Sequence, residues 1–285
     1  MSQEAPLHRR VRRGASRTAR SLAVLVPFLA SAAALAGPSG PYAPPRDVST
    51  EGHRVTWLFW YTTGLGIVAF TLVCASLVYI VARYRARAGH RAVYDKGTDR
   101  RSLVVTGSLA LLVFLSIDLV LVHRSRADIE EYLFKWPTSA DTVRIEVMPQ
   151  QWVWNFRYAG ADGVFNTADD VVTLNEMWIP KGRPVFLNLK AKDVIHSFYV
   201  PNFRIKQDAN PGHVTRMWFQ AKETGSMEIA CSQLCGWAHY KMKADLTVME
   251  NDAFERWYAE AQGDAKRRFD PADTEAQWGW EWVAK

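Results

Sequence analysis

The chain has 285 residues, a mass of 32.3 kDa and a mean hydropathy of -0.16, which is too polar on average for a polytopic transporter. A hydrophobic content of 48% excludes a disordered chain. The formal charge is +6, but the excess of basic residues lies beside apolar runs, where it sets membrane topology. The isoelectric point near 9.2 therefore does not indicate nucleic-acid binding. Three cysteines are too few for a disulfide framework.

The N-terminus has the pattern of a secretory signal. Residues 8–20 are basic, and residues 21–36 are apolar, short for a spanning helix, and end in the Ala-x-Ala of Ala34 to Ala36. We predict a cleaved signal peptide at residues 1–36, and the alternative is an uncleaved first anchor. Residues 37–56 are rich in proline and glycine and are predicted to form an extended exported linker.

Two apolar runs predict a transmembrane helical hairpin over residues 57–122. Residues 57–82 contain no charged side chain, and residues 102–122 contain a single charged side chain, that of Asp118. As a helix, the first run exceeds the ~30 Å hydrocarbon core. The loop between the runs carries seven basic residues and is predicted to be cytoplasmic, which agrees with an exported N-terminus. Asp118 lies near the outer end of the second run. We expect its side chain to reach the headgroup region, which is favoured over a role in a proton path.

Residues 123–250 are predicted to form an all-β sandwich or barrel. Apolar residues alternate with polar ones over residues 142–148 and 185–191, which indicates strands with one buried face. Residues 213–221 and 242–250 are expected to be further strands, within a total of about ten short strands at most.

Two segments of the outer part have other patterns. Residues 161–170 are rich in turn formers. Their acids could bind Ca²⁺, but their spacing is not that of an EF-hand loop, so a hairpin turn is favoured. Residues 251–285 are predicted to be a C-terminal helix and tail, with Asn251 as a possible N-cap of an amphipathic helix over residues 251–268. The tail holds three tryptophans that suit either a partner or the membrane interface: Trp278, Trp280 and Trp282.

One segment concentrates metal-binding side chains. Cys231, Cys235, His239 and Met242 lie within twelve residues, and His196 precedes Cys231 by 35 residues. Thiolate and thioether ligands favour copper, whereas zinc has little use for methionine. One cysteine, two histidines and a methionine would serve a single blue copper, but two thiolates can bridge a pair of coppers, so we predict two metals. The alternatives are a periplasmic disulfide, a core methionine and an ordinary buried histidine.

The motif C-S-x-x-C-G-x-x-H-x-x-M at residues 231–242 resembles that of subunit II of cytochrome c oxidase, which carries the binuclear copper centre Cu-A. The resemblance extends over about residues 57–258 and implies a two-helix transmembrane hairpin followed by an all-β cupredoxin-like Greek-key domain. Supporting matches are Gln151-Trp152-Val-Trp154, Asp193-Val-Ile-His196-Ser, and Lys206-Gln-Asp208 followed by Pro211-Gly212.

The resemblance implies a role for each residue of the motif. Trp152 matches the surface aromatic through which electrons enter from cytochrome c, although without the resemblance it would be predicted to be a core residue. Family members carry a Glu between the two cysteines, and its side chain binds a Mg²⁺ shared with subunit I. This chain has Gln233 there, and an amide is a weaker Mg²⁺ ligand than a carboxylate. The implied copper ligands are the side chains of His196, Cys231, Cys235, His239 and Met242 and the backbone carbonyl of Gln233.

The implied function is electron transfer within a respiratory translocase. The chain would accept electrons from cytochrome c at two copper ions and pass them to the haem of subunit I, where oxygen is reduced to water and protons are translocated. It would not be catalytic alone. Its partners would be subunits I and III, cytochrome c or a similar donor, and the membrane, with no nucleic acid. It would be a multi-pass protein of the bacterial inner membrane with a periplasmic C-terminal domain.

The charge of the outer part gives a weaker signal about the donor. Residues 123–285 carry 20 basic and 23 acidic side chains, and Asp193 lies beside His196. This small acidic excess favours a basic donor steered by electrostatics, but a solvated surface explains it nearly as well.

Two departures from the family limit what is carried over. Residues 100–106 lack the Glu and Trp found before the second helix of many members, so no proton-channel role is transferred. No Cys-x-x-Cys-His is present, so a fused haem c domain is not expected.

Three other functions compete with this one. An exported, membrane-anchored copper carrier or assembly protein would need exposed, exchangeable ligands. A quinol oxidase subunit would lack the cysteine pair and both histidines. A nitrous oxide reductase would need a large additional domain.

Overall fold

The structure, a computed structural model, describes residues 43–89, 91, 94, 96–270 and 272. The chain divides into two units, residues 1–46 and 47–285, and all the helices and strands described below belong to the second. The predicted signal peptide, residues 37–42 of the predicted linker and the three tail tryptophans lie outside the described residues, so those assignments remain predictions. Residues 52–56, which were expected to be extended linker, instead form the beginning of a helix.

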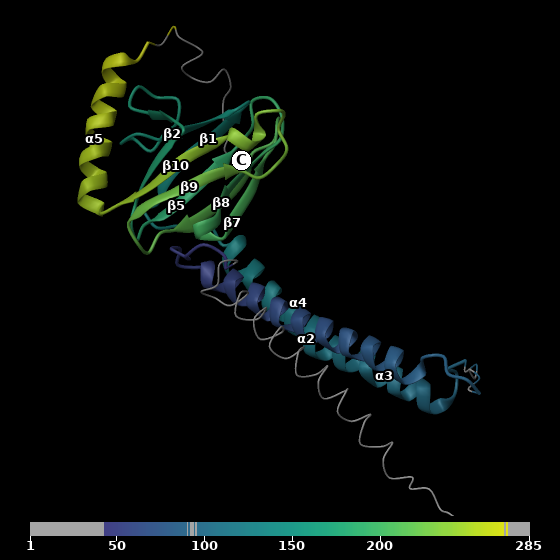
Figure 1. Ribbon diagram of the computed structural model, residues 1–285. Helices are drawn as coiled ribbons and strands as arrows, with labels where there is room; N and C mark the ends of the chain where they lie inside the picture. Colours follow the sequence, from purple (N-terminus) through teal and green to yellow (C-terminus); the bar gives the residue numbers. More distant parts are fainter. Residues whose placement is uncertain (1–42, 90, 92–93, 95, 271, 273–285) are drawn as a thin grey trace, which may run out of the picture. The chain divides into compact units, whose positions relative to one another are not determined.

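Two long apolar helices run side by side (Figure 1). The second of them is interrupted by a π-helical turn and ends in another. The elements are α2 (Gly52–Tyr84), α3 (Arg100–Val113), the π-helical turn Phe114–Asp118, α4 (Leu119–Asp128) and the π-helical turn Ile129–Leu133.

The apolar side chains of these helices are not buried in a protein core. Both helices are long and apolar enough to cross a membrane, and their most apolar windows are entirely unburied within the chain. At 1.5 Å per residue, the 33 residues of α2 give a helix of about 50 Å, longer than a ~30 Å hydrocarbon core. Trp57 and Tyr61 stack with ring centroids 5.0 Å apart near its beginning, as interfacial aromatics do. These features fit a membrane anchor.

The β-domain consists of two five-stranded sheets that pack face to face. One has the strand order β3-β2-β1-β5-β8, and the other has the order β4-β10-β9-β6-β7. Most pairs are antiparallel, but β1 and β5, and β10 and β4, are parallel. The strands are β1 (Val143–Gln150), β2 (Val153–Tyr158), β3 (Val171–Leu174), β4 (Glu176–Pro180), β5 (Pro184–Leu189), β6 (His196–Val200), β7 (Ile205–Ala209), β8 (Thr215–Gln220), β9 (Gly225–Cys231) and β10 (Lys243–Met249).

The core lies between the two sheets and follows the alternation seen in the sequence. Val185, Leu187 and Leu189 of β5 have no exposed surface, and Leu246 of β10, in the other sheet, is also fully buried. Because successive strand residues point to opposite faces, each sheet buries one set and exposes the other. The predicted order, an apolar helical hairpin followed by an all-β sandwich, is confirmed.

Helix α5 (Asn251–Arg268) lies along one flank of the sandwich (Figure 1). Trp257 packs its ring 4.9 Å from that of Trp178 on β4, and Phe254 is fully buried beneath the helix. The helix begins at Asn251 rather than after it, because the Phe254 amide donates to the carbonyl of Glu250 at 3.0 Å. Asn251 is therefore the first helical residue and not the N-cap that the sequence suggested.

The loop between β2 and β3 uses its acids to hold its own backbone. Asp169 accepts hydrogen bonds from the amide of Ala161 at 2.9 Å and from the hydroxyl of Thr167 at 2.9 Å. Asp170 accepts from the amide of Asn166 at 2.7 Å. Asp162 accepts from the amide of Val164 at 2.8 Å and so forms an Asx turn, which agrees with the hairpin-turn interpretation of residues 161–170.

A buried ion pair lies beneath the same loop. Arg157 on β2 faces Glu146 on β1 in register, and its Nε donates to Glu146 Oε2 at 2.8 Å. Both side chains are about 1% exposed. The ring of Phe165, from the loop, covers the guanidinium at 5.8 Å.

Candidate metal centre

Strand pairing brings the predicted ligands to one end of the second sheet. His196 is the first residue of β6, and Cys231 is the last residue of β9, its neighbour in the sheet. Cys231 pairs with Phe198, two residues beyond His196 and therefore on the same face of β6. The chain then forms a loop, which we call the metal loop (residues 231–242), before returning as β10. Neighbouring strands thus bring together ligands that are 35 residues apart.

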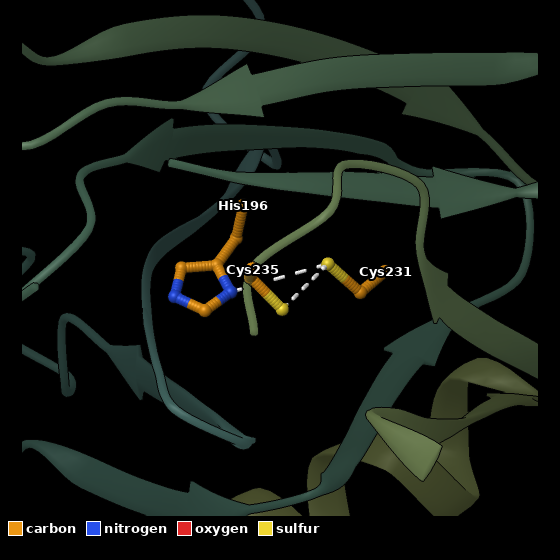
Figure 2. A group of neighbouring side chains, drawn as sticks. All are labelled: His196, Cys231 and Cys235. Atoms are coloured by element: carbon orange, nitrogen blue, oxygen red, sulfur yellow. Dashed lines mark hydrogen bonds between the residues drawn. The ribbon is translucent and has the colours of Figure 1, made fainter. Parts of the chain in front are cut away.

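The two thiols lie close together and are not joined. Their Sγ atoms are 3.7 Å apart, far beyond the ~2.05 Å of a disulfide, and both cysteines are free (Figure 2). His196 Nδ1 lies 3.9 Å from Cys231 Sγ, and His239 Nδ1 lies 3.6 Å from Cys235 Sγ. Each thiol therefore has an imidazole nitrogen of its own, and the disulfide alternative does not describe this structure.

Two further soft or neutral donors complete the group. Met242 Sδ lies 3.8 Å from Cys235 Sγ, and Cys231 Sγ donates to the carbonyl oxygen of Gln233 at 3.3 Å. Cys231, Cys235 and Met242 are at most 8% exposed. All six predicted donors are therefore brought together around two buried thiols.

Asp193 orients the first histidine. Its Oδ1 accepts from Nε2 of His196 at 2.9 Å, and its Oδ2 accepts from the amide of Gln151 at 2.7 Å. A proton on Nε2 of the neutral ring leaves the lone pair of Nδ1 facing Cys231. His196 has no exposed surface, so the ring has little freedom to turn. These bonds lower the pKa of Asp193 against the effect of its partial burial, so the carboxylate stays ionised.

The two thiols differ in their acidity. Burial disfavours the Cys231 thiolate, but hydrogen bonds outweigh it, led by the one that His196 Nδ1 donates when the ring is protonated, and lower the pKa to about 6. For Cys235, burial and the neighbouring Cys231 both raise the pKa, to about 12. Two adjacent thiolates repel each other, so the second proton leaves only when a cation compensates the charge.

Comparison with known proteins identifies the family. The family model described as cytochrome c oxidase subunit II, periplasmic domain, matches residues 143–249. The "Alternative cytochrome c oxidase subunit 2" of Bradyrhizobium diazoefficiens is 33% identical over 223 residues, which are 70% of this chain and 76% of the relative. The chain belongs to the cytochrome c oxidase subunit II family. Its members are subunits of haem–copper oxidases, which are oxidoreductase complexes.

Two further proteins are similar to this chain. The cytochrome c oxidase subunit 2 of Alkalihalophilus pseudofirmus is 30% identical over 237 residues, 80% of this chain and 65% of that protein. A crystal structure of the periplasmic domain of cytochrome oxidase subunit II from Bradyrhizobium japonicum is 27% identical, covers 45% of this chain and 97% of its own, and superposes with a TM-score of 0.38.

The donors of this subunit II chain fit copper. The ligand atoms of His196, Cys231 and Cys235 lie within 4.8 Å of one another, the one such group of at least three His, Cys, Asp or Glu in the part of the chain that the structure describes. Two thiols, two imidazoles and a thioether form a soft set, which suits copper better than zinc or a hard cation. A donor set built around two thiols also exceeds what a single blue copper uses.

Trp152 lies against the metal loop of subunit II as a half-buried side chain. Its Nε1 donates to the carbonyl of Cys235 at 3.3 Å, and Gln151 Nε2 donates to the same oxygen at 2.7 Å. Gly236 permits this contact: it has φ +123°, and a Cβ there would lie 3.0 Å from Trp152 Cζ2. The sequence analysis assigned no role to Gly236, although its position directly after a ligand in a tight loop was the available signal.

Trp237 is a second feature that sequence reasoning missed. Its ring packs edge-on against Trp152 with centroids 5.4 Å apart, yet its side chain is 77% exposed. Gln233 is exposed, and its backbone carbonyl accepts from the thiol of Cys231.

Proposed function

We propose that this chain is the electron-accepting subunit of a haem–copper oxidase. It takes electrons from a cytochrome c and delivers them to the haem of subunit I, where oxygen is reduced to water with proton translocation. One observation carries the proposal: two unbonded thiols lie 3.7 Å apart, each with its own imidazole nitrogen within 3.9 Å. The subunit II family, to which the chain belongs, supports the rest.

The donor set supports two copper ions. Both thiols lie between the two imidazoles, so each can serve two metals. When bound, copper held by these residues would supply reversible one-electron chemistry. We propose as ligands the side chains of His196, Cys231, Cys235, His239 and Met242 and the backbone carbonyl of Gln233.

The surrounding residues exclude water from this site and orient one of its ligands. Burial of the thiols and of Met242 keeps water from the donors, which preserves a low-dielectric environment. Asp193 holds the His196 ring with Nδ1 toward the thiols. Trp152 joins the protein surface to the carbonyl of Cys235 through a single hydrogen bond, which supports its assignment as the residue through which electrons enter.

The proposal extends to the placement of the chain in the cell. Two helices of membrane-spanning length support a multi-pass protein of the bacterial inner membrane, with the β-domain on the periplasmic side and subunits I and III as partners. We propose residues 1–36 as a signal peptide and 37–56 as a linker. Residues 57–122 would be the transmembrane hairpin, 123–250 the Cu-A domain and 251–285 the C-terminal helix and tail. Mg²⁺ at the subunit I interface is not included, because Gln233 offers an amide there.

Copper stoichiometry tests the proposal directly. The full chain, purified in detergent, is loaded with copper, freed of excess metal and assayed for copper per chain. We expect two coppers and an electron paramagnetic resonance signal split by two copper nuclei. Cys231→Ser and Cys235→Ser should lose that signal, whereas Cys74→Ser, which removes the thiol in α2, should keep it. One copper or none in the unaltered chain would refute the binuclear site.

A second measurement separates this function from that of a copper carrier. An electron-accepting subunit should hold its copper against a chelator and be reduced by ferrous cytochrome c in a stopped-flow experiment. A carrier should release copper readily and show no such reduction. Burial of both cysteines and Met242 favours retention.

A further inference from the structure

We propose that a groove beside the outer ends of the two apolar helices binds an anionic phospholipid of the bilayer. The phosphate headgroup lies against basic side chains, and the glycerol and the first acyl carbons lie against an apolar wall. This inference involves none of the metal donors and does not rest on copper binding.

We call this feature the anchor groove. It has a volume of about 540 Å³, and residues from four segments line it: 51–58, 125–136, 204–207 and 216–218. The first two segments contain the beginning of α2 and the end of the second apolar helix, and the other two contain parts of β7 and β8. Sites for small organic ligands have volumes of about 300–1,000 Å³, so the groove can hold the headgroup and glycerol of one lipid.

Two hydrogen bonds join the helical wall of the anchor groove to its strand wall. The hydroxyl of Tyr132 donates to the carbonyl of Trp218 at 3.3 Å, and Nε1 of Trp218 donates to the carbonyl of Tyr132 at 3.0 Å. The rings of these two residues also pack with their centroids 4.8 Å apart. The groove is therefore a preformed feature of the chain.

The anchor groove opens at the level of the lipid headgroups. Leu58 belongs to the charge-free run of residues 57–82, and Ser125 lies three residues beyond the second apolar run, which ends at Val122. At 1.5 Å per residue, Ser125 is about 5 Å outside the hydrocarbon core. The headgroup layer extends about 5–7 Å beyond that core on each side. The bilayer itself therefore supplies phosphate groups at the depth of the groove.

The side chains that line the anchor groove carry an excess of positive charge. Arg54 forms ion pairs with both acids of the lining, because its Nε lies 2.6 Å from Glu51 Oε2 and its Nη1 lies 3.0 Å from Asp128 Oδ1. The other basic side chains of the lining are those of Arg204, Lys206 and Arg216. Four cations against two acids give the lining a net charge of +2, which an anion compensates. Guanidinium groups bind phosphate oxygens with particular strength.

Exposed apolar side chains line the same groove. Val55 is 45% exposed, Leu133 52% and Phe134 69%. Apolar groups that gather at one exposed place mark a binding site. A small inorganic anion would leave these side chains in water, whereas a phospholipid covers them with its glycerol and acyl carbons. The cations, the apolar wall and the depth in the bilayer together select an anionic phospholipid.

The experiment measures photochemical cross-linking of lipid to the protein. The oxidase complex that contains this chain is reconstituted into phosphatidylcholine bilayers with a small share of phosphatidylglycerol that carries a photoreactive group near the glycerol. In parallel bilayers the photoreactive lipid is phosphatidylcholine, which has the same apolar part and no net charge. Cross-linked peptides from residues 125–136 report on the groove, and the total yield on the complex is the internal standard. We expect phosphatidylglycerol to label these peptides at least about fivefold more than phosphatidylcholine.

Variants of the chain test the charges and the groove separately. Each basic side chain near an anionic lipid changes binding by about fivefold. Lys206→Gln/Arg216→Gln should therefore lower the phosphatidylglycerol yield about tenfold or more and leave the phosphatidylcholine yield unchanged. Val55→Trp fills the groove and should lower both yields.

Two matched controls should change neither yield. Lys181→Gln removes a lysine that is 40% exposed on the β-domain and does not line the groove. Val81→Trp makes the same substitution as Val55→Trp near the other end of α2.

Three results would overturn the inference. The first is an equal yield for the two lipids, and the second is a Lys206→Gln/Arg216→Gln variant that labels as before or loses both lipids alike. The third is labelling of another subunit with none on residues 125–136, because a protein neighbour would then fill the groove. Copper is assayed in the same samples, and its absence would contradict the proposed function while the lipid result stands.

Discussion

The buried carboxyl group of Glu146 should make the β-domain less stable as the pH rises toward neutrality. Glu146 Oε2 accepts from Arg157, and its Oε1 is buried without a hydrogen-bond partner among the described residues. Asp170 Oδ2 lies 3.7 Å from the same guanidinium, so two carboxylates share one arginine. Burial, offset in part by Arg157, raises the pKa of Glu146 from 4.5 to about 7.

The sign and size of the effect follow from this pKa. Between pH values of about 4.5 and about 7, the folded chain retains a proton that the unfolded chain has released, so stability falls as the pH rises. Each unit by which the pKa of Glu146 is raised corresponds to ~1.4 kcal/mol. The free energy of unfolding therefore falls by about 3 kcal/mol across that pH window. Above it, both states are ionised and the curve is level. Asp170, whose pKa burial raises to about 6, acts in the same direction.

Amide hydrogen exchange in β1 and β2 measures this loss in the full chain. Exchange rates, corrected for the intrinsic pH dependence, give the free energy of opening at each pH. Glu146→Gln should remove most of the slope, and Glu228→Gln, which alters an exposed pair with Lys243 on the other sheet, should leave it intact. Stability that is level or rises from pH 5 to pH 7 in the unaltered chain would refute the reasoning, as would a slope that survives in the double variant Glu146→Gln/Asp170→Asn.

Three further substitutions probe the site and its frame. Gly236→Ala places a Cβ at positive φ and 3.0 Å from the ring of Trp152, and should cost about 1–3 kcal/mol in free energy of unfolding, measured by chemical denaturation. Asp193→Asn removes the carboxylate that orients His196, and should weaken copper binding about 10- to 100-fold in a chelator competition. Tyr258→Phe removes the hydroxyl that bonds a carbonyl of the β2–β3 loop at 3.2 Å, and should lower stability by about 1 kcal/mol in the same denaturation assay.

Two of these expectations have a matched control. Gly182→Ala also places alanine at positive φ, +74°, but with nothing within 4 Å, so it isolates backbone strain from the contact with the indole. Asp245→Asn alters an exposed acid on β10 and should leave copper affinity unchanged. An Asp193→Asn variant that binds copper as tightly as the unaltered chain would show that orientation of the histidine ring does not limit affinity.

Periodicity and composition were sufficient to locate the two apolar helices, the C-terminal helix and four of the ten strands. Residues 142–148 and 185–191 have strict alternation, and both form strands within two residues of the expected bounds. The charge-free run of residues 57–82 lies within the longer helix α2, whose added first turn is polar. The π-helical turn at Phe114–Asp118 had no such signal, because one acid at its end does not distinguish a π-helical from an α-helical turn.

Burial of Glu146 could not be predicted from its own strand. Alternation in residues 143–147 places it opposite the apolar face, where a solvated side chain is expected. It is buried because Arg157 lies opposite it on β2 and because the β2–β3 loop, through Phe165, folds over both. Which loop covers the outer face of a sheet depends on tertiary contacts that no local pattern encodes.

The residues of the candidate site were also predicted only in part. The motif identified both cysteines and both histidines, because their chemistry and spacing are unusual together. It gave no role to Trp237, since a tryptophan in a loop is predicted to be buried as readily as exposed. The arrangement of that ring against Trp152 depends on how two distant segments meet.

Pairing between β9 and β10 holds the two ends of the metal loop together. The amide of Cys231 donates to the carbonyl of Met242 at 3.1 Å, and pairing continues along β9 and β10 from Ala230 and Lys243. The frame that holds the donors is thus assembled by ordinary strand pairing over an apolar interior, unlike small zinc domains that collapse without their ion. We therefore expect that copper can be inserted after the domain has folded, and that it can be removed and restored while the scaffold stays intact.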